Sequence, residues 1–208
     1  VVDALVSAVS NRNVDLSHRY YAMKAGWMEV DQLDWWDRNA PLPGDDDRKF
    51  SWPEAERIVL DAFTGFDPDM AATAQPFFER NWIDAAPRPG KSSGAFSHPV
   101  TPSAHPYILM NFAGKSRDVM TLAHEMGHGV HQCLAAANGY LMSDTPLTLA
   151  ETASVFAEML AFRQLVDSAE EAETRRILLA GKVEDMLNTV VRQIAFHNFE
   201  TAFHAARG

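Results

Sequence analysis

Two histidines and a glutamate in the middle of the chain have the spacing of a metal site. His124, Glu125 and His128 form the pattern His-Glu-x-x-His. On a helix, residues i and i+4 lie on one face about 6 Å apart along the axis, so both imidazoles can bind one ion. Catalytic zinc takes three protein ligands and leaves a fourth position for water. A neighbouring carboxylate can take a proton from that water, which is the chemistry of zinc hydrolases.

The third ligand should come from another element, and Glu151 is the candidate. It lies on a helix predicted from Leu147 to about Asp167, after a turn that lets the chain fold back antiparallel. Apolar residues on both sides predict that this helix is largely buried, yet Glu151 and Glu158 share one stripe of it. A buried carboxylate without a partner costs on the order of several kcal/mol. Metal coordination by Glu151 and a second-shell hydrogen bond from Glu158 to a ligand imidazole would explain both.

Other histidines have more than one interpretation. His131 lies about 10 Å in rise from His124, so the two cannot easily share an ion, and we expect a second-shell or packing role for His131. His105 precedes a predicted strand near the site and is either a substrate contact or an ordinary loop histidine. The cluster His197–His204 is a polar flank of a packed helix or, less simply, a second metal site.

The helix that carries the His-Glu-x-x-His pattern is predicted over residues 118–138, with Gly139 as its stop. Leu122, Met126, Val130 and Cys133 fall on the side opposite the histidines. One face can therefore enter a core while the other holds a metal. Cys133 is the single cysteine, which excludes an internal disulfide and favours an inert packing role.

The rest of the chain predicts a mainly α fold with a small β-sheet just before this helix. We expect a helical region of the channel wall in residues 1–81 and a zinc-binding core in residues 82–208. The predicted helices are Val1–Ser10, Leu16–Met28, a Ser51-capped helix to Phe63, Asp67–Asn81, and 169–206 after a capping box at Ser168–Glu171. The predicted strands are Trp82–Ala85, Gly94–Ser97 and Tyr107–Phe112, and Pro41–Asp47 is a solvated loop.

The composition is that of an ordinary globular protein, and it excludes some functions. The 208 residues are 47% hydrophobic and 22% charged, with a net charge of −10. This charge argues against nucleic acid as a partner and is compatible with cationic substrates. No apolar run reaches the ~20 residues that span a membrane. An early Asp3, no basic start and a single cysteine predict no signal peptide and a cytoplasmic location.

Taken together, the motifs closely resemble the oligoendopeptidase F branch of the M3 zinc metallopeptidases, in the thimet oligopeptidase clan. The resemblance covers nearly the whole chain. It is carried by TLAHEMGHGVHQ at 121–132 and SDTPLTLAETASVFAEML at 143–160, with support from residues 82–100, 105–120 and 191–200.

The resemblance implies roles at the matching positions. His124, His128 and Glu151 would be zinc ligands, and Glu125 the catalytic base. The strand Tyr107–Phe112 would be the edge strand that pairs with an extended peptide, so Tyr107, Ile108 and Met110 would contact substrate. The implied fold is a mainly helical zincin with a deep channel for short peptides.

The resemblance also implies that this chain is an internal part of a longer protein. Family members are much longer, and a later segment carries a tyrosine and a histidine that stabilise the oxyanion. Because this chain stops at Gly208, we expect it to lack these donors, and losing one can cost about 10²–10³ in rate.

The sequence therefore predicts a zinc-dependent endopeptidase for short peptides, with one Zn²⁺ per chain. Water on the zinc, activated by Glu125, would attack the scissile carbonyl, and Glu125 would then protonate the leaving nitrogen. Two alternatives stay open. One is a zinc carboxypeptidase of similar helical fold. The other is a catalytically incomplete fragment that binds metal or peptide without turnover.

Overall fold

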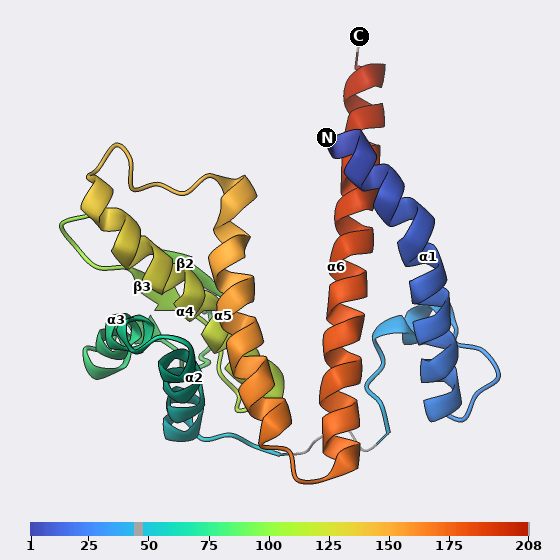
Figure 1. Cartoon of the computed structure of the whole chain (residues 1–208), viewed down its shortest axis with the longest axis horizontal. Helices are drawn as coiled ribbons and strands as arrows, with labels where there is room; N and C mark the ends of the chain where they lie inside the picture. Colours follow the sequence, from blue (N-terminus) through green and yellow to red (C-terminus); the bar gives the residue numbers. More distant parts are fainter. Residues whose placement is uncertain (44–47, 208) are drawn as a thin grey trace. The chain divides into compact units, whose positions relative to one another are not determined.

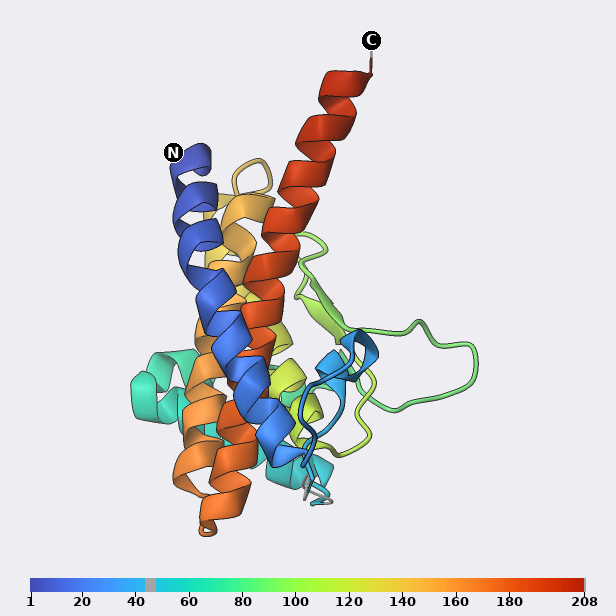
Figure 2. The ribbon, with the colours of Figure 1, turned by 90° about the vertical axis from the view of Figure 1, so that its right-hand side faces the viewer.

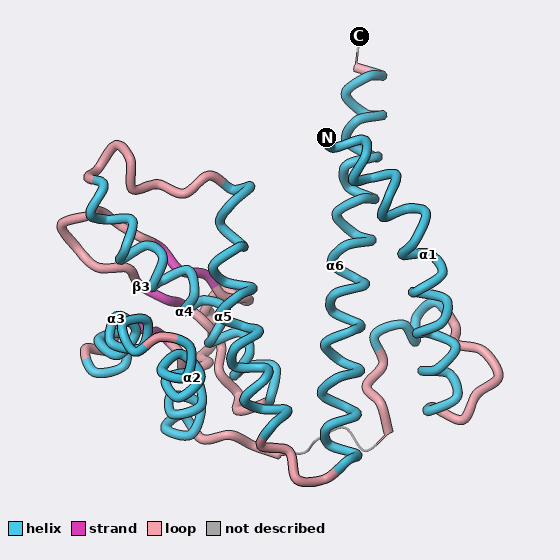
Figure 3. Tube along the Cα trace, viewed as in Figure 1, coloured by secondary structure: helices cyan, strands magenta, loops and turns pink. Residues whose placement is uncertain are grey.

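The computed structural model describes residues 1–43 and 48–207, so residues 44–47 of the predicted loop Pro41–Asp47 lie outside the described part. The described residues are mainly helical with one small sheet, which confirms the predicted fold class (Figures 1 and 3). They divide into two compact units. One holds the described residues of Val1–Asp46 and Glu170–Gly208, and the other holds those of Asp47–Ala169.

The first unit pairs the first and last helices of the chain. Helix α1 (Val2–Trp27) runs beside α6 (Ala172–Ala206), and a short 3₁₀ helix, η1 (Trp35–Asn39), follows α1 (Figures 1 and 2). The predicted break at Asn11–Asn13 is wrong, because α1 is continuous through these residues and polar side chains do not by themselves interrupt the backbone hydrogen bonds of a helix.

A buried ion pair joins α1 to α6. The Lys24 ammonium, with a side chain only 1% exposed, donates to Glu184 on α6 and to the Arg38 carbonyl, both at 2.7 Å. The Tyr20 hydroxyl donates to the same carboxylate at 2.8 Å. Burial, followed by this carboxylate, raises the pKa of Tyr20 well above its usual range. The charge of Lys24 is thus compensated inside the unit.

The second unit contains four longer helices, and local sequence signals set most of their ends. They are α2 (Trp52–Phe66), α3 (Pro68–Glu79), α4 (Ser116–Ala135) and α5 (Leu147–Asp167). The Ser51 and Asp67 side chains cap α2 and α3 by accepting backbone N–H groups. After α4, the short η2 (Ala136–Asn138) ends at Gly139, whose φ of 78° suits glycine.

One predicted cap does not form. Ser168 ends α5, and its hydroxyl donates to the Leu165 carbonyl at 3.0 Å. Helix α6 begins at Ala172 after Glu171. The predicted capping box at Ser168–Glu171 is therefore wrong, because the chain uses Ser168 to finish one helix before it starts the next.

The core of the second unit forms where α4 packs on α2, α3 and α5. Phe63, Phe77, Leu122 and Met126 are fully buried there. Cys133, at the end of the same face of α4, is half-buried, and burial raises the pKa of its thiol. Because α2 and α3 pack against the helix with the His-Glu-x-x-His pattern, they belong to its unit. The unit boundaries therefore differ from the predicted division after residue 81.

The sheet has three short strands, β1 (Ile83–Asp84), β2 (Phe96–His98) and β3 (Tyr107–Leu109), in the order β1-β3-β2. β3 pairs in parallel with β1 and antiparallel with β2. The prediction that Tyr107–Phe112 is an edge strand is wrong, because β3 has a neighbour on each side. β2 is the edge strand that packs against α4.

No helix within residues 1–43 and 48–207 is both long enough and apolar enough to cross a membrane.

Candidate metal centre

Two helices approach closely enough to share a site. α4 and α5 lie side by side (Figure 1). Gly127 of α4 lies in close contact with α5. A Cβ atom added at Gly127 would lie 2.6 Å from the Ala157 Cβ and 2.7 Å from the Ala153 carbonyl oxygen. Only glycine leaves room for this contact. The site is therefore built on a helix–helix approach that the sequence motif itself allows.

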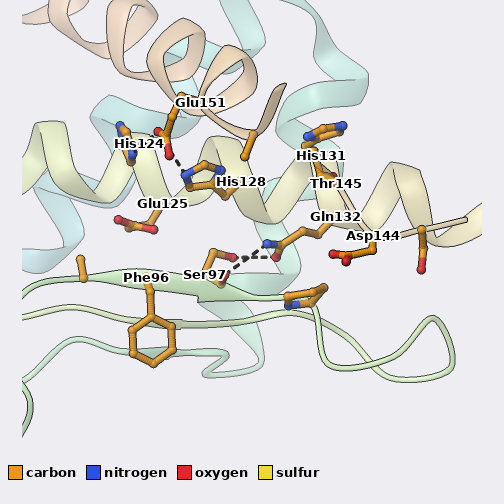
Figure 4. Close-up of a pocket in the computed structure, with 14 residues that line it drawn as sticks. Phe96, Ser97, His124, Glu125, His128, His131, Gln132, Asp144, Thr145 and Glu151 are labelled. Atoms are coloured by element: carbon orange, nitrogen blue, oxygen red, sulfur yellow. Dashed lines mark hydrogen bonds and ion pairs between the residues drawn. The ribbon is translucent and has the colours of Figure 1, made fainter. Parts of the chain in front are cut away.

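Three side chains from these helices meet at one point. One carboxylate oxygen of Glu151 lies 3.2 Å from His124 Nε2 and 3.5 Å from His128 Nε2. The two imidazole rings are 5.1 Å apart and nearly perpendicular. Figure 4 shows both histidines on α4 with Glu151 reaching down to them from α5. The predicted ligand set is thus brought together by the fold.

The spacing of these donors fits a tetrahedral metal ion. Donor atoms at about 2.0–2.1 Å from zinc in a tetrahedron lie about 3.3 Å from one another. The two distances from Glu151 are close to that value, and all three donor atoms lie within 4.8 Å of one another. Imidazole and carboxylate are also the donors of catalytic zinc sites. Within the described part of the chain, this is the single group of three such donors close enough to hold an ion.

The carboxylates near the His124 imidazole differ from those near the His128 imidazole. Glu158 lies 3.1 Å from His124 Nδ1, the nitrogen that faces away from Glu151. Burial lowers the pKa of His124, but Glu158, Glu125 and Glu151 together raise it by more, so that it lies above its usual value. Burial also lowers the pKa of His128, and there the lowering prevails. The two imidazoles therefore have opposite tendencies to hold a proton.

Glu125 is another ionisable side chain of this group. It is only 6% exposed and lies between α4 and β2, beside both histidines (Figure 4). Burial is the largest cause that raises the pKa of its carboxyl group, and Glu151 adds to it, against a lowering by His124 and by a hydrogen bond from the Ser97 backbone. A carboxylate with a raised pKa is a better base near neutral pH.

A cavity of about 350 Å³ opens in front of these residues. Its walls come from α4, from β2, and from the segment that leads into α5. The lining includes His124, Glu125, His128, His131, Glu151, Phe96, Ser97, Gln132, Asp144 and Thr145. A Ser97–Gln132 pair ties β2 to α4, since the Ser97 hydroxyl donates to Gln132 at 2.8 Å and Gln132 donates to the Ser97 carbonyl at 3.2 Å.

The predicted substrate residues lie elsewhere. Ile108 and Met110 are buried, and neither lines the cavity. His105 stacks on Trp82, with ring centres 3.7 Å apart, and contacts Tyr107. Sequence reasoning missed Ser97, Gln132 and Asp144, and no local pattern distinguishes them from other polar residues.

The predicted burial of α5 is wrong in its first half. Glu151 has a side chain that is 63% exposed, and Leu147 and Leu149 are exposed as well. Three of the five buried residues of the helix are small, namely Ser154, Ala157 and Ala161. Ser154 and Ala157 lie against Gly127 of α4. Apolar residues on both sides of a helix thus did not mean burial here.

Comparison with known proteins identifies the family of this chain. The model of one protein family, Peptidase family M3, matches residues 1–208. The chain belongs to peptidase family M3. Oligopeptidase PepF of Bacillus subtilis is 31% identical to this M3 chain, and the match covers 98% of this chain. The chromosomal oligoendopeptidase F of Lactococcus lactis is 29% identical, and that match also covers 98% of this chain. The chain spans about a third of the length of these relatives, 30% and 34% respectively.

Solved structures share the fold of the M3 chain. A candidate peptidase from Chlamydophila abortus has a TM-score of 0.82 at 26% identity, with 98% of this chain and 34% of that chain covered. PZ peptidase A, solved with an inhibitor, has a TM-score of 0.77 at 18% identity, with 96% of this chain and 36% of that chain covered. The helices and sheet described here therefore form a recurring part of larger peptidases.

Proposed function

We propose that this chain carries the zinc site of an endopeptidase that hydrolyses short peptides. The observation that carries the proposal is that both imidazole Nε2 atoms meet one oxygen of Glu151 at tetrahedral spacing. Membership in family M3 and the names of its relatives, an oligopeptidase and an oligoendopeptidase, support a peptide substrate. The single cysteine is compatible with a cytoplasmic location.

Each residue of the site has a distinct part in this proposal. His124, His128 and Glu151 hold the ion, which when bound lowers the pKa of water and polarises a carbonyl group. Glu158 accepts a hydrogen bond from His124 Nδ1, which keeps Nε2 free to act as a donor atom. The carboxylate of Glu125 takes a proton from a water molecule in the cavity and then passes it to the leaving amide nitrogen.

We also infer that the peptide lies along β2 instead of β3. β2 is an edge strand, and Phe96 and Ser97 line the cavity beside Glu125. An extended peptide can add to such an edge through backbone hydrogen bonds. The family resemblance implies that an edge strand pairs with the peptide. We therefore assign this role to Phe96–His98 instead of Tyr107–Phe112. His131 lies on the cavity wall beyond the ligands, where it can contact the substrate or order the other imidazoles.

The test is Glu125→Gln, which removes the base and keeps the shape of the side chain. We expect the variant to bind zinc as the unmodified chain does and to lose at least about 10²-fold in cleavage rate. Zinc content and the cleavage of a quenched fluorescent peptide with a blocked C-terminus would be measured on the same samples. Full activity of the variant would refute the proposed role of Glu125.

The same assay separates the alternatives. A carboxypeptidase would fail to cut the peptide with the blocked C-terminus but would cut its free-ended form. A chain that binds one zinc ion and cuts neither peptide would support the incomplete fragment, since this chain spans a third of its relatives. An endopeptidase would cut both peptides, and the relatives named oligoendopeptidases favour that result.

A further inference from the structure

The carboxylate of Glu151 is held in place although its side chain is mostly exposed. It is 63% exposed, against 25% for His124 and 16% for His128. An exposed glutamate has freely rotating bonds and populates several rotamers, so ordering it costs conformational entropy. Packing alone cannot restrain this side chain. Some specific contact must keep its oxygen between the two imidazoles.

The hydroxyl of Ser154 supplies such a contact. Ser154 Oγ donates to the same Glu151 oxygen that faces both imidazoles, at 2.7 Å. It also lies 3.2 Å from the Glu151 backbone carbonyl, one turn earlier on α5. A hydroxyl has one proton, and a short bond to an ionised acceptor is stronger than a longer bond to a neutral one. The carboxylate is therefore its main partner.

Ser154 is itself fixed by helix packing. It is fully buried, and it lies at a close contact between α5 and α4. A Cβ atom added at Gly127 would be only 2.8 Å from the Ser154 Cα. The position of the hydroxyl is thus set by the contact between the two helices, and solvent does not compete for it.

We propose that Ser154 is a positioning residue that holds the Glu151 carboxylate ready for the metal. The inference rests on the proposed zinc site and adds a group that does not touch the ion. It links the packing of α4 on α5 to the placement of the one donor that comes from α5. With Ser154 in place, the donor set is formed before the ion arrives.

The test is the zinc affinity of Ser154→Ala in the 208-residue chain, measured by competition with a chelator. Loss of a group that orients a ligand typically weakens metal binding about 10–100-fold, and we expect a loss in that range. The metal-free melting temperature should stay nearly unchanged, because the released carboxylate is exposed and water can solvate it. A purely structural role would instead lower this melting temperature and leave the zinc affinity unchanged.

Ser168→Ala is the matched control. Ser168 lies at the end of the same helix, and its hydroxyl also contacts the carbonyl three residues earlier, at 3.0 Å compared with 3.2 Å for Ser154. This variant should bind zinc like the unmodified chain. A double-mutant cycle adds a second test, because Ser154→Ala should have little further effect on zinc affinity once Glu151→Ala has removed its acceptor.

The outcomes separate the inference from the proposed function. If the unmodified chain binds zinc and Ser154→Ala binds it within about twofold as tightly, the role of Ser154 is refuted and the zinc site stands. If Ser154→Ala lowers the zinc affinity equally in the presence and absence of the Glu151 carboxylate, that role is also refuted. An unmodified chain that binds no zinc would overturn the zinc site and, with it, this inference.

Discussion

Replacing Gly127 by alanine should push apart the two helices that carry the donor atoms. The new methyl group would lie 2.6 Å from the Ala157 Cβ, 2.7 Å from the Ala153 carbonyl oxygen and 2.8 Å from the Ser154 Cα. Two of these neighbours are backbone atoms of α5, which cannot turn aside as a flexible side chain would. The clash is therefore relieved only if α5 itself moves, and Glu151 moves with it.

Two effects of opposite sign decide the change in stability. Alanine in place of glycine inside a helix gains about 1 kcal/mol. Overpacking of a close contact costs about 1–3 kcal/mol, and the cost is at its upper end where backbone must shift. We therefore expect Gly127→Ala to lower the free energy of unfolding by about 1–2 kcal/mol. At roughly 4 °C per kcal/mol, the melting temperature should fall by about 4–8 °C.

Gly181→Ala is the control for helix propensity alone. Gly181 lies inside α6, and a Cβ atom there would have no heavy atom within 4 Å. That variant should be more stable by about 0.5–1 kcal/mol. The assay is thermal unfolding of both variants with and without zinc, together with zinc affinity, which should fall more than about tenfold in Gly127→Ala alone. If Gly127→Ala is as stable as Gly181→Ala and binds zinc normally, the helix contact does not position the site.

Two further predictions concern charged groups. Lys24→Met should lower the free energy of unfolding by about 3 kcal/mol, because it leaves Glu184, 16% exposed, without its partner. The free energy of unfolding would be measured by denaturant titration. There, Arg57→Ala should lower it by less than about 0.5 kcal/mol, since the pair of Arg57 with Asp61 is exposed. Equal losses of stability in the two variants would contradict the reasoning. In the metal-free chain, NMR titration should find the pKa of His124 above and that of His128 below the usual histidine value. As pH rises, His128 should therefore lose its proton first, and the reverse order would show that the carboxylates do not control His124.

Much of the donor set could be predicted because it depends on local geometry. The i, i+4 spacing of His124 and His128 puts both imidazoles on one face of any helix. Ser51, Asp67 and Gly139 begin or end their helices through contacts within a few residues. Glu151 was found because α5 follows α4 after a short connection.

Other features depended on partners that are distant in the sequence. Periodicity does not say which strand is central, and β3 is central because β1 and β2 both pair with it. The apolar residues of α5 did not show which side faces α4, since small residues make that contact. The unit boundary likewise follows from the packing of α2 and α3 on α4.

The sequence by itself pointed to the proposed donors and base, because the His-Glu-x-x-His spacing puts His124 and His128 on one face of a helix and Glu151 follows on the next helix. Tertiary structure alone decided how these groups are held. Gly127 lets α5 approach, Ser154 then reaches the Glu151 carboxylate, and β2 becomes the strand beside Glu125. The contact of Gly127 with α5 and the placement of β2 beside Glu125 join residues that lie far apart in the sequence, and only the folded chain brings them within reach of one another.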